Sequence, residues 1–267
     1  MRPILLELGS YRFSSYFVCV LFGYLLAVYL VTRAAHRQGL PVLPYFDLCL
    51  VAGVAGLVGA RLMHVVVELP RFYLSHPMAI LKFWYGGFVL YGGLLSGALA
   101  AYVFARFRAL PWRQSLDLMV KPLLLAIAIG RLGCFLNGCC YGKITSCPWP
   151  ISVIYQANGG VVPQASPLHT PLYATPIYDA LLCLGLYFYL LYLDRSWRVQ
   201  GNRIPPGRLA WYGVVGYALG RFMIEYLRAD PERGFYGPQA LSTAQLISLA
   251  LLAVAGWLWW RERRQQS

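Results

Sequence analysis

The stretch LDLMVKPLLLAIAIGRLGCFLNGCCYG, residues 116–142, decides the fold class of this chain. Its first part is an apolar run, and a helix needs about 20 apolar residues to cross a bilayer. Near the end of the run lie Arg131 and then Asn137. A guanidinium costs about 2.5–3.5 kcal/mol at the bilayer centre, so it normally has an anionic partner. The stretch therefore predicts a membrane-spanning helix whose buried cation binds an anion.

The composition indicates a polytopic membrane protein. Of the 267 residues, 59% are apolar and 12% are charged, and the mean hydropathy is +0.55. Soluble domains have about 25% charged residues. The net charge of +13 is compatible with nucleic acid binding, but the basic residues lie at the ends of apolar runs and not on one soluble face, so we expect no nucleic acid partner. We find no inverted repeat that would indicate a transporter.

Apolar runs of spanning length predict an all-α fold with seven transmembrane helices. They cover approximately residues 13–33, 45–67, 88–106, 116–133, 176–194, 208–227 and 242–260. We expect a single integral membrane domain over residues 1–267, with the Pro- and Gly-rich loop 134–175 as a small head region outside the membrane. The first run has neither a basic n-region nor a small-residue cleavage site, which favours a retained helix over a signal peptide.

Basic residues in the loops predict the orientation. Twelve lie after the first, third and fifth helices and in the C-terminal tail: Arg33, Arg37, Arg106, Arg108, Arg113, Arg195, Arg198, Arg203, Arg208, Arg261, Arg263 and Arg264. Seven lie on the opposite side: Arg2, Arg12, Arg71, Lys82, Lys143, Arg228 and Arg233. The positive-inside rule then places the N-terminus outside and the C-terminus in the cytoplasm.

With this orientation, the polar groups inside the predicted helices share one depth, in the outer half of the membrane. They are Tyr16, Arg61, His64, Arg131, Arg221, Glu225 and Arg228. Arg221 and Glu225 have the i, i+4 spacing of a neutralising pair, and arginines near helix ends can extend to the interface. The interpretation that we favour is that Arg61, Arg131 and Arg221 converge on a negatively charged lipid headgroup.

Paired glycines open the third helix, in Trp84-Tyr85-Gly86-Gly87 and Tyr91-Gly92-Gly93. Glycine permits a left-handed backbone and the close approach of another group. For Gly97, further along the same helix, close helix packing is the better explanation. For the paired glycines we expect a loop whose backbone amides meet a ligand.

The motif Gly130-Arg131-Leu132-Gly133-x-Phe135-x-Asn137-Gly138-x-x-x-Gly142 resembles the signature of the bacterial prolipoprotein diacylglyceryl transferases. The resemblance extends over essentially the whole chain. It includes Ser15-Tyr16, Gly59-Ala60-Arg61, Trp84-x-Gly86-Gly87, Thr175-Pro176-Ile177-Tyr178-Asp179 and Gly220-Arg221-Phe222-x-Ile224-Glu225-x-x-Arg228.

The resemblance implies a transferase of lipoprotein biosynthesis, a multi-pass protein of the bacterial inner membrane. Such an enzyme moves the diacylglyceryl group of phosphatidylglycerol to the lipobox cysteine thiol of a prolipoprotein signal peptide. The reaction forms a thioether and releases glycerol phosphate, and it implies neither a cofactor nor a metal. Arginines in a water-poor cavity suit the charge that develops on the leaving phosphate.

Site residues follow from the positions in the motifs. Arg131 and Arg221 match the two essential arginines of the family, and we assign them to the phosphate. Glu225 matches the acid that holds the arginine of the sixth helix. The substrate-binding residues implied in this way are Tyr16, Arg61, Gly92, Gly93, Asn137, Gly142, Glu225 and Arg228.

The chain departs from the family pattern where the acceptor thiol must be activated. Tyr91 replaces the usual histidine before the paired glycines, and other changes occur at Tyr85, Cys134, Cys139 and Tyr173-Ala174. A phenol with a pKa of about 10 is a poor base at neutral pH. The candidates for the catalytic base are therefore Tyr91, with its pKa lowered by an arginine, and His64. The alternative is a paralogue that binds phosphatidylglycerol or lipoprotein substrates without turnover, or that uses another acceptor.

Four of the seven cysteines cluster after the fourth predicted helix: Cys134, Cys139, Cys140 and Cys147. A location outside the membrane favours one or two disulfides, with three possible pairings. A tetrathiolate metal site is an alternative, although the Cys-x4-Cys-Cys-x6-Cys spacing matches no usual zinc pattern. A thiol that transiently carries the diacylglyceryl group is a third alternative.

Overall fold

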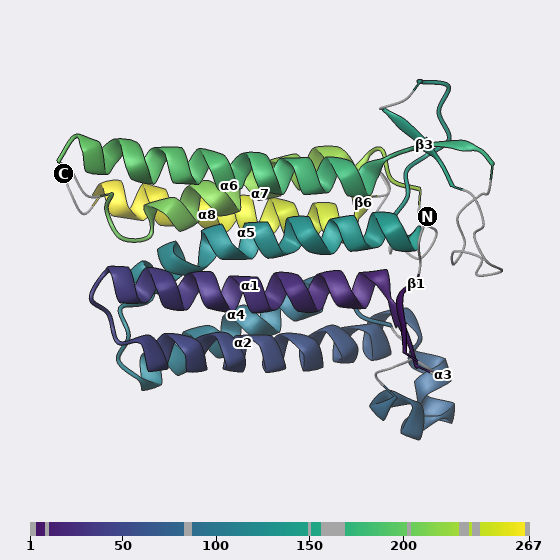
Figure 1. The fold of residues 1–267 in the computed structure, drawn as a ribbon, viewed down its shortest axis with the longest axis horizontal. Coiled ribbons are helices and arrows are strands. Elements are labelled where there is room, and N and C mark those ends of the chain that lie inside the picture. The colour runs from purple at the N-terminus through teal and green to yellow at the C-terminus, as the bar shows by residue number, and fades with distance from the viewer. Residues whose placement is uncertain are drawn as a thin grey trace. The chain divides into compact units, whose positions relative to one another are not determined.

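The computed structural model of this chain (Figure 1) describes residues 4–8, 11–82, 87–148, 151–155, 169–201, 204–229, 235–236 and 241–264. It divides into two compact units. The first unit comprises Met1–Ala27 and Met119–Ser267, and the second unit comprises Val28–Leu118. The motif residues Trp84, Tyr85 and Gly86 lie outside the described residues, as does part of the loop 134–175.

The described part of the chain is mostly helical. Its long helices are α1 (Ser15–Arg37), α2 (Val42–Met63), α4 (Leu90–Phe107), α5 (Trp112–Asn137), α6 (Thr175–Val199), α7 (Arg208–Glu225) and α8 (Thr243–Arg264). Each of the seven predicted runs overlaps one of these helices. Six helices, all but α7, are long and apolar enough to cross a membrane. The exception, α7, carries Arg208, Arg221 and Glu225 within its 18 residues.

A polar helix end explains why α6 extends beyond its predicted run. Helix α6 continues past its apolar part because Arg198 forms an ion pair with Asp194, one turn earlier. Lys121 of α5 donates to the same carboxylate, with 2.5 Å between Nζ and Oδ2. In the first unit α6 packs against α7, and α7 against α8, and the three helices run side by side in Figure 1.

Short elements that the sequence analysis did not predict lie between the helices. The described residues include three antiparallel hairpins: β1 (Ile4–Leu8) with β2 (Tyr11–Ser14), β3 (Ser152–Ile154) with β4 (Pro171–Tyr173), and β5 (Phe235–Tyr236) with β6 (Leu241–Ser242). After α2 come a π-helical turn, η1 (His64–Glu68), a short helix, α3 (Pro70–Ser75), and a 3₁₀ turn, η2 (Pro77–Leu81). The fold is therefore not strictly all-α.

Small residues bring α2 and α4 of the second unit into close contact. A Cβ atom on Gly92 would lie 2.6 Å from the carbonyl oxygen of Gly59, and one on Gly97 would lie 2.9 Å from that of Ala52. Ser96 donates a hydrogen bond across the same contact, to Ala55 O at 2.9 Å. Membrane helices that lack a hydrophobic driving force associate through such small residues. Gly97 therefore has the packing role expected of it.

The packing extends to Gly92 and Gly93, for which we expected amides that meet a ligand. Gly92 lies against Gly59, and a Cβ on Gly93 would lie 3.2 Å from Gly56 O. The amide of Gly93 donates to Val89 O within the first turn of α4. Helix packing thus accounts for both glycines by itself, and their contact with substrate stays a prediction.

Replacing Gly92 with alanine is expected to destabilise the protein. The new methyl group would meet the backbone oxygen of Gly59 and the Cβ of Met63, both at 2.6 Å, so α2 and α4 must move apart. Overpacking of this kind costs about 1–3 kcal/mol. The measurement is the melting temperature of the purified protein in detergent.

Gly185→Ala is the matched control, because a Cβ on Gly185 of α6 meets nothing within 4 Å. It should leave the melting temperature unchanged or raise it slightly, since alanine favours a helix over glycine. Equal melting temperatures for the two variants would contradict a packing role for Gly92.

Candidate active site

The C-terminus of α5 is closed by a Schellman motif. Gly138 adopts the left-handed conformation, with φ of 77°. Its amide donates to Phe135 O at 3.3 Å, and the amide of Cys139 donates to Cys134 O at 3.1 Å. Glycine is needed at 138 because a side chain would strain this backbone. The motif returns the chain onto the last turn of α5 and so brings Cys139 next to Cys134.

Gly142 lies between two extended segments. Its amide donates to Tyr173 O at 3.0 Å, and it forms an isolated bridge with Arg228. A Cβ atom at this position would lie 2.6 Å from Tyr173 O and 2.9 Å from Leu227 O. Gly142 therefore joins the chain after α5 to the segments before α6 and after α7, and backbone contacts explain why a glycine stands here.

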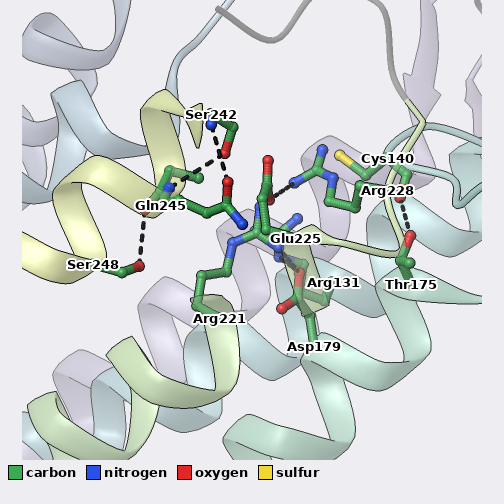
Figure 2. A network of polar contacts seen from close by, with 11 residues as sticks. Arg131, Cys140, Thr175, Asp179, Arg221, Glu225, Arg228, Ser242, Gln245 and Ser248 are labelled. Carbon is green, nitrogen blue, oxygen red and sulfur yellow. Dashed lines mark hydrogen bonds and ion pairs between the residues drawn. The ribbon is translucent and has the colours of Figure 1, made fainter. Parts of the chain in front are cut away.

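Asp179 holds two arginines in the interior of the first unit (Figure 2). Its Oδ2 atom lies 3.3 Å from Nε of Arg131 and 3.1 Å from Nη1 of Arg221. The exposed fractions of Asp179, Arg131 and Arg221 are 1%, 7% and 2%. Because a buried cation needs a partner, these contacts make it possible for two guanidinium groups to lie side by side. The predicted convergence of Arg131 and Arg221 is present, and the shared carboxylate is its cause.

The network continues along α7. Nη2 of Arg221 donates to Oε2 of Glu225 at 2.6 Å, and Nη1 of Arg228 lies 4.0 Å from the same oxygen. Glu225 therefore holds the arginine of its helix, as the motif implied. Counted over the described residues, these three arginines and two carboxylates leave one formal positive charge in excess. All five side chains are buried, so this excess charge acts in a medium of low dielectric constant.

A capping box places a further polar side chain beside the network. Ser242 precedes α8, and its amide donates to Oε1 of Gln245 at 3.1 Å, while the amide of Gln245 donates to Oγ of Ser242 at 3.3 Å. In Figure 2 the side chain of Gln245 extends toward Arg221 and Glu225. The start of α8 thus lies beside the network.

Some hydrogen-bonding atoms of the network have no hydrogen-bond partner among the described residues. Arg131 uses only Nε for Asp179, and no hydrogen bond joins its two Nη atoms to any described residue. Within the same part of the chain, Nε of Arg221 and Oδ1 of Asp179 are buried without a hydrogen-bond partner. Polar atoms of this kind are costly unless a ligand or water satisfies them. The arrangement is suited to a polar or anionic ligand next to Arg131.

Three thiols lie next to the arginines. The sulfur atoms of Cys134, Cys139 and Cys140 all lie within 4.8 Å of one another. Hydrogen bonds from Cys134 and Cys139, together with the charges of Arg228 and Arg131, hold the pKa of the Cys140 thiol well below its ordinary value, despite burial. The hydrogen bond from Cys134 lowers the pKa of Cys139, but its hydrogen bond to Cys140 and its burial together raise it to about 12.

The cysteines are all free thiols in this structure. Cys147, the fourth member of the predicted cluster, does not belong to the group of three sulfur atoms. Cys140, a member of that group, is also connected to α6, because its carbonyl oxygen accepts a hydrogen bond from Thr175 Oγ1 at 2.7 Å. In Figure 2 the Cys140 side chain lies beside Arg228.

Tyr16 and Asn137 contact the same region. The Cα atom of Tyr16 lies 3.1 Å from where a Cβ on Gly133 would be, so α1 packs closely on the end of α5. The phenol of Tyr16 interacts electrostatically with Arg131 and with the three clustered thiols. The side chain of Asn137 forms a hydrogen bond with Cys139. Both residues thus border the arginines, and their contact with substrate stays a prediction.

Arg61 has a different environment, in the second unit. Its guanidinium donates to four backbone carbonyls, with Nε to Ile80 O at 3.1 Å, Nη1 to Gly87 O at 3.2 Å, and Nη2 to Ala79 O at 2.8 Å and Lys82 O at 3.3 Å. The side chain of Arg61 is only 3% exposed, and the backbone carbonyls of the segment that follows α3 compensate for its burial. This contact explains the buried charge of Arg61 without a lipid, and its role in substrate binding stays a prediction.

His64 lies on the same side of α2 as Arg61, next to Gly87. A Cβ atom on Gly87 would meet Nε2 of His64 at 2.4 Å and Nη1 of Arg61 at 2.8 Å, and Gly87 has a φ of +80°. The ring of His64 also packs edge-on against Tyr73, with centroids 5.8 Å apart. Tyr91, at the start of α4, has a buried hydroxyl without a hydrogen-bond partner among the described residues.

Sequence reasoning missed the most central residue, Asp179. The expected explanation for an acid near a helix N-terminus is the helix dipole, but this effect fades beyond the first turn. Asp179 is the fifth residue of α6. An acid at that depth in an apolar helix is a signal for a paired cation from another helix, and this signal would have identified it.

Comparison with known proteins identifies the family. The model of the prolipoprotein diacylglyceryl transferase family matches residues 3–261. A phosphatidylglycerol–prolipoprotein diacylglyceryl transferase of Clostridium tetani is 33% identical over 254 residues, which are 95% of this chain and 95% of the relative. The protein of that name from Parasynechococcus marenigrum is 32% identical over 99% of this chain and 95% of its own. The chain therefore belongs to the prolipoprotein diacylglyceryl transferase family.

Proposed function

We propose that this protein transfers the diacylglyceryl group of phosphatidylglycerol to the lipobox cysteine of prolipoprotein signal peptides. The relatives with 30% identity or more carry the name of this activity. The single observation that supports it in this chain is that Arg131 and Arg221 converge on one oxygen of Asp179. This buried cationic site has the chemistry needed to bind a lipid phosphodiester.

The site lies within a polytopic membrane protein, for which we propose seven spans. Helix α7, the sixth in chain order, is the span added to the other six, and its charges do not prevent insertion because Arg221 is neutralised by Asp179 and Glu225. The distribution of loop arginines supports an N-terminus in the periplasm and a C-terminus in the cytoplasm. The location that follows is the inner membrane of a bacterium.

The reaction moves negative charge from sulfur to phosphate. The acceptor thiolate attacks the glyceryl carbon, a carbon–sulfur bond forms, and the carbon–oxygen bond to phosphate breaks. The phosphodiester, with one negative charge, leaves as a glycerol phosphate monoester with up to two. The free Nη atoms of Arg131 are placed to stabilise this added charge, and Asp179 keeps Arg131 and Arg221 in position. Preorganised donors in a dry site can contribute about 2.7–4 kcal/mol each.

Activation of the acceptor thiol is a separate requirement. Tyr91 and His64 are candidates for the base because of their positions in the motifs, and the buried hydroxyl of Tyr91 has an unmet hydrogen bond among the described residues. Tyr16 and Asn137 border the arginines and are placed to contact the headgroup or the acceptor.

A reconstituted assay tests the function directly. Purified full-length protein in detergent is mixed with phosphatidylglycerol and a synthetic peptide that carries a lipobox cysteine. The expected product is the peptide with a diacylglyceryl thioether, identified by mass spectrometry, together with glycerol phosphate. A peptide with serine in place of that cysteine is the control. Binding of lipid or peptide without any product would favour the alternative, a paralogue without turnover.

Asp179→Asn is expected to lower the transfer rate by about 100-fold. The amide has the shape of the carboxylate but no charge, so Arg131 and Arg221 would repel each other without a neutralising partner. The measurement is kcat and KM for phosphatidylglycerol in the assay above, with the loss mainly in kcat. A melting curve for each variant separates loss of activity from loss of folding.

Asp194→Asn is the matched control, because Asp194 is on the same helix and also pairs with two cations, Lys121 and Arg198. Its rate should stay within about two-fold of the unmodified protein, as expected for a site away from the chemistry. Similar rates for Asp179→Asn and the unmodified protein would contradict the role of Asp179.

Tyr91→Phe and His64→Ala distinguish the two candidate bases. The variant that removes the base should lose about 100-fold in rate at neutral pH and recover part of it at higher pH, where more of the acceptor is thiolate. The measurement is the pH profile of kcat/KM for the peptide. If neither change alters the profile, neither residue is the base.

A further inference from the structure

A cluster of three thiols adjoins the arginine network and has no role in the proposed reaction. The sulfur atoms of Cys134, Cys139 and Cys140 lie within 4.8 Å of one another. We propose that these three cysteines bind one Zn²⁺ ion, and that the open fourth position of the ion binds the acceptor cysteine of the signal peptide. The metal site follows from the cluster alone, whereas the role of the fourth position rests on the proposed function.

The geometry of the cluster is close to that of a zinc site. Zinc–thiolate bonds are about 2.3 Å long, so two sulfur atoms of a tetrahedral site are roughly 3.8 Å apart. The observed upper limit of 4.8 Å means that no pair of sulfur atoms has to close by more than about 1 Å. Small changes of side-chain torsion are enough for this, because all three cysteines are already on one side of the turn.

The backbone explains how an unusual spacing produces this cluster. Cys134 and Cys139 occupy the two positions that a Schellman motif brings into contact. Cys140 follows in a left-handed conformation, with φ of 60°, which turns the chain again. The carbonyl oxygen of Cys140 is then held by Thr175. The Cys-x4-Cys-Cys spacing matches no usual zinc pattern along the chain, but the folded backbone brings the three cysteines together in space.

Charge favours a divalent ion at this place. Three thiolates around Zn²⁺ carry one negative charge, and the adjacent network of three arginines and two carboxylates carries one positive charge. Arg131 and Arg228 are the members of that network that act on Cys140. The opposite charges of the two groups attract each other in a buried environment, where an isolated charge would be costly.

A zinc ion would supply a means to activate the acceptor thiol other than the candidate bases Tyr91 and His64. A thiol that binds Zn²⁺ loses its proton, and catalytic zinc sites combine three protein ligands with an open position. The sulfur then uses a lone pair to form the bond to the glyceryl carbon, and the electrons of the broken carbon–oxygen bond go to the phosphate oxygen. The thiol proton leaves to solvent. The product thioether is neutral and binds zinc weakly, which allows release.

Metal analysis of the full-length protein tests the site. After purification with Zn²⁺ in the medium and removal of loose metal, we expect about one zinc ion per chain by elemental mass spectrometry. Replacement by Co²⁺ should give the absorption of sulfur-to-cobalt charge transfer. Cys134→Ser, Cys139→Ser and Cys140→Ser should each lower the zinc content at least about 10-fold. Cys147→Ser, in the same segment but outside the cluster, should retain the metal.

The transfer assay then separates the metal site from the proposed function. A chelator should lower the rate roughly 100-fold, and added Zn²⁺ should restore it. Efficient transfer by a protein that holds no metal would overturn the inference and leave the proposed function intact. Bound zinc in a protein that transfers nothing would support the metal site and refute the proposed function.

Two further results would overturn the metal site. One is equal zinc content in Cys139→Ser and the unmodified protein. The other is a mass spectrum under non-reducing conditions in which two of the three cysteines are joined as a disulfide, because the joined sulfurs cannot bind the ion.

Discussion

The carboxylate of Asp179 bridges Arg131 and Arg221, and the candidate active site depends on this contact. A guanidinium inside an apolar protein is stable only with a partner, and loss of one partner of a buried pair costs about 3–5 kcal/mol. One carboxylate cannot neutralise two cations, so Glu225 takes a share of Arg221. The network still retains an excess positive charge and unused donors on Arg131. The interaction that stabilises the site is therefore also the one that prepares it for an anion.

Turns and close contacts of the backbone position the side chains around this contact. The Schellman motif at Gly138 returns the chain onto α5, and the close contacts of Gly142 join that return to the segments beside α6 and α7. Both glycines belong to the family signature, and both have backbone reasons to be glycine. The signature thus describes a folded junction around the arginines. The cysteines fill the side-chain positions that this junction brings together.

Much of the architecture could be predicted because spanning helices need long apolar runs, and all seven predicted runs overlap helices. The convergence of Arg131 with Arg221 also followed from depth, since a helix rises by a constant amount per residue. The environment of Arg61 could not be predicted, because its partners are backbone carbonyls of a later segment, and every residue has such a carbonyl. The packing of Gly92 against α2 could not be predicted either, because one sequence does not reveal which helix lies against it.

The sequence by itself determined a membrane protein with buried arginines, its family and the candidate residues for binding the phosphate, because hydropathy and local motifs are properties of the chain. Only the tertiary structure decided which groups pair. It selected Asp179 as the shared partner of two arginines, and it brought Cys134, Cys139 and Cys140 together while Cys147 stayed apart. The physical reason is that ion pairs and thiol clusters depend on distances of a few ångströms between side chains, which helix packing and chain reversals set and residue spacing does not.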